Sequence, residues 1–259
     1  MDRKQWLGAG LVVLGGFVFF NVLMGIAMGL VFFNAKASPG VAWFPLPALA
    51  LIIAATWWAR GRWDMRLAMP PNVPWGRVYA FGFLAMLAAK CIKGIEGAYH
   101  EVTLVAPAAP ENVSAVFALL YLFMVPFFAA VLAEIAFRGI IQTRMEKTLP
   151  LWQTLLFVST INTLSHAGFT DISTQWLYLM AVNLGFCYTT WLAQSIVPAI
   201  VVHVAMNVLF PAAEHFFGPL GLGELSAGGI VTLGVLGATL SALAAWLAGG
   251  VQASVARAG

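Results

Sequence analysis

The sequence predicts an all-α fold: a polytopic integral membrane protein of about eight transmembrane helices, with both termini in the cytoplasm. Composition is the first reason, because 61% of the 259 residues are hydrophobic and 9% are charged, whereas an ordinary soluble domain is about one quarter charged. The second reason is that several apolar runs reach the roughly 20 residues needed to cross a hydrocarbon core. The third is the division of charge between the loops. We expect a single transmembrane domain over residues 1–259.

Apolar runs define the elements, and charged or Pro/Gly-rich breaks separate them. The first run follows Arg3 and Lys4 and is longer than a signal-peptide core of about 7 to 15 residues, so we expect a retained span. The breaks lie at 34–40, 60–75, 100–112, 146–150, 168–173, 194 and 212–226. The predicted spans are 6–33, 41–59, 76–99, 113–145, 151–167, 174–193, 195–211 and 227–249.

Charged residues divide between the loops by sign. The basic set is Arg3, Lys4, Arg60, Arg62, Arg66, Arg77, Arg144, Lys147 and Arg257, and the acidic set is Glu101, Glu111, Asp171, Glu214 and Glu224. If the spans alternate in direction, the two sets fall on opposite sides, with Lys36 as the exception. The positive-inside rule then makes the basic side cytoplasmic.

This distribution also bears on partners and cofactors. The net charge is +3, but the basic residues lie in short loops and form no basic face, so we expect no nucleic-acid partner. Cys91 and Cys187 lie in apolar segments, without metal-ligand or disulfide-framework spacing. We therefore expect membrane lipids as partners and no cofactor. The Ala- and Gly-rich composition looks bacterial, which predicts the bacterial cytoplasmic (inner) membrane.

Five polar residues interrupt the apolar spans. Glu134 and Arg138 are four residues apart in the fourth span, His166 ends the fifth, and His203 and Asn207 are four apart in the seventh. An ionisable group at the bilayer centre costs about 2.5 to 3.5 kcal/mol. With a helical rise of about 1.5 Å per residue, each pair and the single His lie at similar depths along their helices. The spacing therefore predicts one polar cluster near mid-membrane.

Such a set suits peptide hydrolysis. A carboxylate and an imidazole can deprotonate a water molecule, while a second imidazole and an amide stabilise the oxyanion. Zinc is an alternative, because Glu134, His166 and His203 make a two-His, one-carboxylate set, although no His-Glu-x-x-His helix is present. A non-enzymatic immunity or scaffold protein, or a transporter, is a further alternative. The sequence shows no symmetry between two halves that would favour a transporter.

The segment 133–139 (AEIAFRG), followed by His166 and by 203–207 (HVAMN), resembles the CPBP family. This family contains CaaX prenyl proteases and bacteriocin-processing or immunity proteins, and is also called ABI. Its pattern is Glu-Glu-x-x-x-Arg, then Phe-x-x-x-His, then His-x-x-x-Asn or Asp. The resemblance covers about residues 113–211, which we take as the protease-like core.

The resemblance implies a glutamic intramembrane endopeptidase with eight helices. In the family pattern, the first Glu and the second-motif His activate water, which makes His166 the base or its partner. His203 and Asn207 would stabilise the oxyanion. Glu134 with Arg138 would organise the helix.

The chain departs from the pattern where the water-activating Glu is expected, because that position is Ala133. Glu134 is adjacent but about 100° around an α-helix, so it should not substitute without rearrangement. Three accounts are open: an engineered inactivating substitution, which we favour, a natural pseudoprotease, or catalysis through Glu134. We expect the chain to be catalytically impaired. Asn162 replaces the pattern's Phe, which we interpret as a packing position.

The substrate class predicted from the resemblance is a membrane-associated, C-terminally lipidated or anchored protein or peptide. Lipidated C-terminal Cys peptides, bacteriocin leader peptides and C-terminal membrane anchors are all compatible. Lys90 and Lys93 lie near the outer end of the third span. They either snorkel and pair there or bind a substrate carboxylate.

Overall fold

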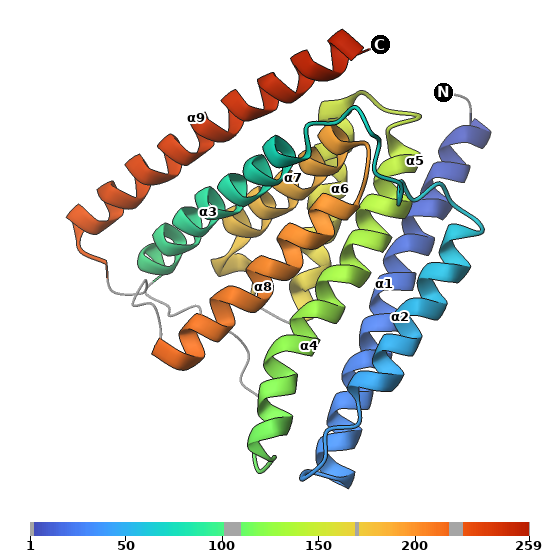
Figure 1. Ribbon diagram of the computed structural model, residues 1–259, viewed down its shortest axis with the longest axis vertical. Helices are drawn as coiled ribbons and strands as arrows, with labels where there is room; N and C mark the ends of the chain where they lie inside the picture. The colour runs from blue at the N-terminus through green and yellow to red at the C-terminus, as the bar shows by residue number, and fades with distance from the viewer. Residues whose placement is uncertain (1–2, 101–109, 169–170, 218–224, 259) are drawn as a thin grey trace.

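The computed structural model describes residues 3–100, 110–168, 171–217 and 225–258. Within these ranges the chain forms eight helical rods and no strand, which confirms the all-α fold (Figure 1). One rod is composite and has a π-helix, η1, near its end. The elements are α1 (Arg3–Ala37), α2 (Pro45–Arg60), α3 (Trp75–Tyr99), α4 (Ala115–Ala133), η1 (Glu134–Gln142), α5 (Thr143–Met145), α6 (Leu151–Ser165), α7 (Trp176–Ala193), α8 (Val197–Phe217) and α9 (Ala227–Ala258).

Successive rods alternate in direction, so both termini lie at the same end of the molecule (Figure 1). The loop between α2 and α3 and the turn after α5 lie at this end and contain Arg62, Arg66 and Lys147, and the adjoining helix ends contain Arg60, Arg77 and Arg144. Two of the acidic loop residues, Glu101 and Glu224, are outside the described residues. That this end faces the cytoplasm stays a prediction of the charge distribution.

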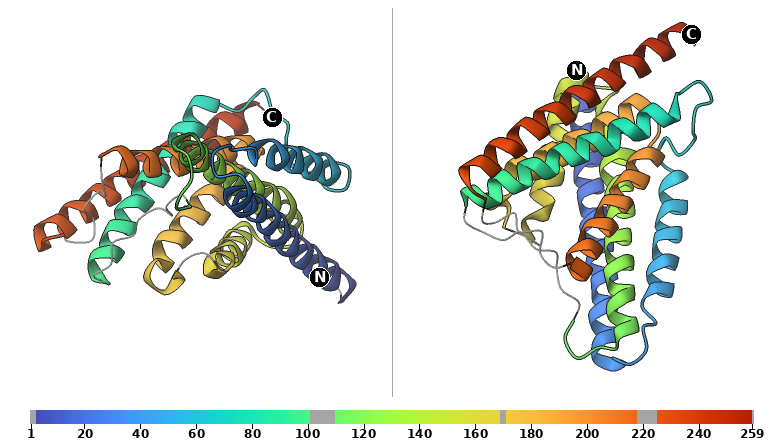
Figure 2. Two further views of the ribbon diagram at one scale, coloured as in Figure 1. Left: turned by 90° about the horizontal axis from the view of Figure 1, so that it is seen from below. Right: turned by 60° about the vertical axis from the view of Figure 1, so that its left-hand side comes forward.

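The rods form two groups at an angle to each other (Figure 2). Helices α1, α2 and α4 make one group, and α3 with α9 makes the other. Between them, α8 packs on α4, while α7 packs on both α3 and α6. Helices α7 and α8 therefore connect the two groups, and α6 packs on α7.

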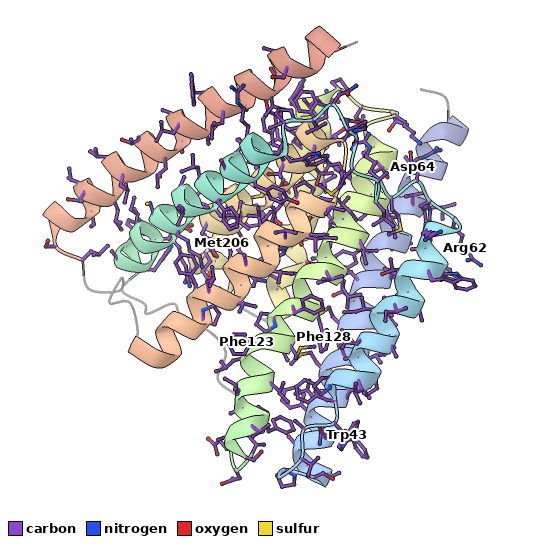
Figure 3. The ribbon with its side chains drawn as sticks, viewed as in Figure 1. Trp43, Arg62, Asp64, Phe123, Phe128 and Met206 are labelled. Atoms are coloured by element: carbon purple, nitrogen blue, oxygen red, sulfur yellow. The ribbon has the colours of Figure 1, made fainter. Side chains whose placement is uncertain are left out.

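Four segments are long and apolar enough to cross a membrane: 8–37, 75–99, 115–145 and 227–254. Helix α2 and residues 197–211 of α8 are shorter apolar helices. Many large apolar side chains point outward, as Figure 3 shows. In the same view Trp43 and Arg62 lie at opposite ends of the α1–α2 hairpin. An apolar exterior of this kind is what a lipid environment requires of a polytopic membrane protein.

The composite rod begins at a capping residue and changes from an α-helix to a π-helix near its end. Ser114 caps α4 by accepting a hydrogen bond from the N–H of Phe117 at 3.1 Å. After Pro126 the helix continues to Ala133 and then widens into η1. Single-turn π-bulges are rare and are frequent at functional sites; here the wide segment spans nine residues. All nine of them are buried.

Helix α1 seats closely against this π-helix at Gly16. A Cβ atom placed on Gly16 would lie 2.6 Å from Cγ1 of Ile141, so a larger residue would force the two helices apart. Small residues allow such close approach between membrane helices.

The turn between α1 and α2 depends on the fully buried side chain of Asn34. Its amide donates to the carbonyl of Val41 at 2.9 Å, and its oxygen accepts from the N–H groups of Trp43 at 2.8 Å and Phe44 at 2.9 Å. These bonds satisfy backbone groups that no helix can pair. One polar side chain therefore closes the α1–α2 hairpin.

We predict that Asn34→Ala lowers the free energy of unfolding by about 2–3 kcal/mol, because buried backbone groups lose their partners. The measurement is the thermal unfolding midpoint of the detergent-purified chain. Asn21→Ala is the matched control, since the Asn21 amide donates to Phe17 within α1 at 2.8 Å. Equal losses in the two variants would contradict this role of Asn34.

Candidate functional site

Glu134 is the centre of the polar cluster and is fully buried at the start of η1. Its Oε1 accepts a hydrogen bond from Nδ1 of His203 at 2.7 Å. The same oxygen lies 3.4 Å from Nη1 of Arg138, an ion pair without hydrogen-bond geometry. The sequence predicted that Arg138 and His203 lie in one polar cluster with Glu134, and in the structure both contact Oε1 of Glu134.

Arg138 is also fully buried, and it turns toward α7. Its Nη2 donates to the backbone carbonyl of Asn183 at 3.1 Å and to the side-chain oxygen of Asn183 at 2.9 Å. The ring of Phe186, one turn further on α7, lies 5.4 Å from the guanidinium carbon and stacks on the imidazole of His203 with centroids 4.3 Å apart. One face of α7 therefore positions both the cation and the imidazole.

Asn183 extends the network to α6. Its side-chain oxygen also accepts from Nδ2 of Asn162 at 2.6 Å, and its own amide donates to Oγ1 of Thr163 at 3.1 Å. The backbone carbonyl of Asn162 then accepts from Nδ1 of His166 at 2.8 Å. A chain of buried contacts thus runs from His203 through Glu134 and the two asparagines to His166.

The acceptors select one tautomer for each neutral imidazole. A carbonyl and a carboxylate can only accept, so Nδ1 of His166 and Nδ1 of His203 donate. Nε2 of each ring then has the free lone pair. The arrangement offers two imidazole bases and one buried carboxylate.

Three further buried atoms have no hydrogen-bond partner in the described part of the protein: Oε2 of Glu134, and Nε and Nη1 of Arg138. Buried polar groups without partners are costly and often mark sites where a ligand or solvent binds. These atoms lie beside the His203 contact. They are one acceptor and two donors that the network leaves unsatisfied.

The remaining predicted residues lie nearby but differ in their contacts. Ala133 is buried as the last residue of α4 and packs in the apolar core. Asn207 is half-buried on α8, one turn beyond His203, and no hydrogen bond of its side chain is found within the described residues. Their roles stay predictions.

Asn162 was interpreted from the sequence as a packing position, and that interpretation is wrong. The side chain is buried and donates to Asn183, so it is part of the polar network. Asn183 itself was missed, although an Asn within a predicted span was a signal. Phe186 gave no signal, because an aromatic residue in an apolar helix is usual.

Lys90 and Lys93 lie on α3 away from the central carboxylate. The Lys90 ammonium is 4.3 Å from the ring of Phe210 and 5.2 Å from that of Tyr178, and the Lys93 ammonium is 5.8 Å from Tyr178. One turn beyond Lys93, the buried carboxylate of Glu96 accepts from the first N–H groups of α7 at 2.7 Å. This end of α3 therefore anchors the start of α7.

Among the described residues, no three or more His, Cys, Asp or Glu side chains are grouped in a way that could hold a metal ion. The zinc set of Glu134, His166 and His203 is therefore not assembled as a ligand cluster. The network described above links the same residues through hydrogen bonds instead.

Comparison with known proteins gives one family. Residues 115–209 match the family model described as Type II CAAX prenyl endopeptidase Rce1-like. The match spans α4 to α8, which contain every member of the buried network, and it confirms the family resemblance over this segment. At the family level it supports an intramembrane endopeptidase. No curated protein and no solved structure matches.

We predict that Asn183→Leu lowers the free energy of unfolding by about 2–4 kcal/mol, because Arg138 and Asn162 each lose a buried acceptor. A double-mutant cycle with Asn162→Leu tests the contact through thermal unfolding midpoints. The double variant should lose less than the sum of the single variants, since no orphaned amide is left at position 162. Strictly additive losses would show that the two asparagines do not interact.

Proposed function

We propose that the buried network is the hydrolytic centre of a glutamic-type intramembrane endopeptidase. The observation that carries the proposal is the continuous contact chain inside a bundle of apolar helices, which links His166, Asn162, Asn183, Arg138, Glu134 and His203 in that order. Its bases and donors are those that hydrolysis of an amide needs. The matched family description supports the same reaction class.

In this proposal the two imidazoles have different tasks. His166 has a free Nε2 and works with the carboxylate expected at position 133 to deprotonate the attacking water. His203 and Asn207, one turn apart on α8, stabilise the oxyanion. Glu134 and Arg138 orient His203 and balance each other's charge.

The chain with Ala133 is impaired because Glu134 is already engaged. Its Oε1 pairs with both Arg138 and His203, and in this proposal these contacts keep the carboxylate from acting as the general base. A methyl group at position 133 cannot accept a proton. An engineered or a natural substitution has the same chemical effect.

A second mechanism has one specific observation in its favour. The 2.7 Å contact between Glu134 and Nδ1 of His203 resembles the carboxylate–imidazole pair of catalytic triads, in which the carboxylate fixes the tautomer and Nε2 acts as the base. His203 would then activate the water, and position 133 would be dispensable. The chain as it stands would then be active.

The substrate in either mechanism is a membrane-associated protein or peptide, lipidated or anchored near its C-terminus. The family description names prenyl substrates for that family, and an active site enclosed by apolar helices favours a lipid-attached chain. Bacteriocin leaders and C-terminal membrane anchors are the other two classes. Membrane lipids surround the enzyme.

We predict that Ala133→Glu raises cleavage of a membrane-anchored or lipidated test peptide by about 10²-fold or more, because a positioned general base contributes roughly 10²–10⁴-fold. The measurement is product formation in liposomes. Adding His166→Ala to this variant should remove the gain. A folded Ala133→Glu variant without activity would contradict the role of position 133.

The same assay separates the two mechanisms and the non-enzymatic alternative. If His203 is the base, the unsubstituted chain cleaves the peptide, and Glu134→Gln reduces the rate by about 10²-fold or more. A scaffold or immunity protein would cleave in no variant and would keep its biological effect after loss of His166 and Asn207.

Lys90 and Lys93 are proposed to bind the substrate carboxylate near the outer leaflet. We predict that Lys90→Met and Lys93→Met raise the KM of the Ala133→Glu variant about tenfold and leave kcat within twofold, because one charge-assisted contact is worth about 1.5–3 kcal/mol. Initial rates against peptide concentration measure both constants, and a peptide with an amidated C-terminus is the control. Unchanged KM values would assign the lysines to structural packing on Tyr178 and Phe210.

A further inference from the structure

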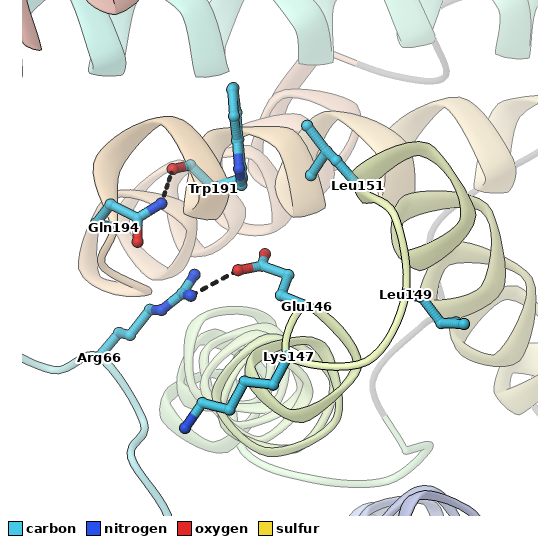
Figure 4. A pocket seen from close by; sticks show the side chains of 7 residues that line it. All are labelled: Arg66, Glu146, Lys147, Leu149, Leu151, Trp191 and Gln194. Carbon is cyan, nitrogen blue, oxygen red and sulfur yellow. Dashed lines mark hydrogen bonds and ion pairs between the residues drawn. The ribbon is translucent and has the colours of Figure 1, made fainter. Parts of the chain in front are cut away.

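A polar pocket of about 260 Å³ opens at the basic end of the molecule, apart from the buried network (Figure 4). The loop between α2 and α3, the turn after α5 and the end of α7 surround it. This volume is below the roughly 300–1,000 Å³ of sites for drug-sized ligands, so the pocket suits a small group. Its lining residues are Arg66, Glu146, Lys147, Leu149, Leu151, Trp191 and Gln194.

Two cations and one anion line this pocket, and the anion is already engaged. Oε2 of Glu146 pairs with Nη2 of Arg66 at 2.6 Å, and Oε1 accepts from Nε2 of Gln142 at 2.7 Å. The charge of Lys147 therefore has no counterpart in the lining. Arg144, the other cation of this turn, lies instead near Gly8 of α1.

Donors at the pocket are left without acceptors. Nη1 of Arg66 is buried and has no hydrogen-bond partner, although Nη2 of the same guanidinium is paired. The ammonium of Lys147 is exposed, and none of the described ion pairs includes it. Leu149 and Leu151 flank the start of α6, where no side chain caps the first N–H groups. Uncapped helix N-termini favour anions.

The backbone holds Arg66 in place rather than leaving it on a free loop. Its φ of 49° is in the left-handed region, which a non-glycine residue adopts only where the structure requires it. Its carbonyl accepts the N–H of Ile196 at 3.1 Å, just before α8 begins. The guanidinium is thus preorganised at the pocket, which lowers the cost of binding.

We propose that this pocket binds a phosphate group, presented by an anionic lipid headgroup. Phosphate accepts from both guanidinium and ammonium donors, and its charge complements the net positive lining. Trp191, near the end of α7, lines the pocket, and Trp side chains are enriched at the level of lipid headgroups in membrane proteins. The site is independent of the proposed hydrolytic function.

The test is binding to the full detergent-purified chain, measured by calorimetric titration. The probes are dihexanoyl phosphatidylglycerol, dihexanoyl phosphatidylcholine and inorganic phosphate. We expect phosphatidylglycerol to bind and phosphatidylcholine to bind at least tenfold more weakly, because its headgroup has a compensating cation. Lys147→Gln should weaken phosphatidylglycerol binding about tenfold, or about 1.4 kcal/mol, because one charged contact to the phosphate is lost.

Arg62→Gln is the matched control, because it removes one positive charge at the same end, outside the pocket. Arg62 packs over the ring of Trp58 at 4.3 Å. The Arg62→Gln variant should bind phosphatidylglycerol with a binding constant within twofold of that of the unsubstituted chain. Arg66→Gln should match Lys147→Gln; if it fails to fold, Lys147→Gln decides alone, because it leaves the Arg66–Glu146 pair intact.

Two results overturn the proposal: equal binding of both lipids, or equal losses in Lys147→Gln and Arg62→Gln, which would indicate diffuse attraction to the basic end. Inorganic phosphate distinguishes the sources. If it binds as tightly as phosphatidylglycerol and Lys147→Gln weakens it equally, the ligand is free phosphate rather than a lipid headgroup. Weak phosphate binding with tight phosphatidylglycerol binding supports the lipid.

Discussion

The structure depends on keeping one guanidinium fully buried inside a bundle of apolar helices. A buried charge is tolerated only when it is paired and hydrogen-bonded. Arg138 is paired with Glu134 on its own rod and donates through Nη2 to Asn183 on α7, while its Nε and Nη1 have no hydrogen-bond partner among the described residues. Those partners in turn recruit His203 and Asn162. The positions of α6, α7 and α8 around η1 therefore follow from satisfying a single cation.

This constraint also accounts for the character of the inner helices. Helix α6 has 15 residues and α7 has 18, and neither is among the four segments that are long and apolar enough to cross a membrane. Their polar residues, such as Asn162, Thr163 and Asn183, face one another and lower the hydropathy of both helices. The outer helices α1 and α9 have 35 and 32 residues, and each contains a segment long and apolar enough to cross a membrane.

The fold could be predicted from sequence because hydrophobicity alone defines spans. All eight predicted spans correspond to helical rods, and Glu134, Arg138 and His203 were correctly expected to meet. The π-helix could not be predicted, since its wider turn depends on the packing of η1 against α1 and α6. The role of Asn162 was misjudged because its hydrogen-bond partner, Asn183, is on another helix, and the sequence does not show that the two side chains meet. The pocket at Arg66 is lined by the α2–α3 loop, the turn between α5 and α6 and the end of α7, and no local sequence pattern predicts that these three segments meet.

The pairing of Glu134 with Arg138 has a consequence for electroneutrality. When both imidazoles are neutral, the carboxylate and guanidinium cancel, so the cluster has no net charge in a medium of low dielectric constant. When a water molecule gives a proton to an adjacent imidazole, the resulting hydroxide and imidazolium remain close together, so their opposite charges are separated by only a short distance. A carboxylate added at position 133 would bring an uncompensated negative charge into this region. Its charge would be balanced if it shared a proton with His166, the group with which it is proposed to deprotonate water.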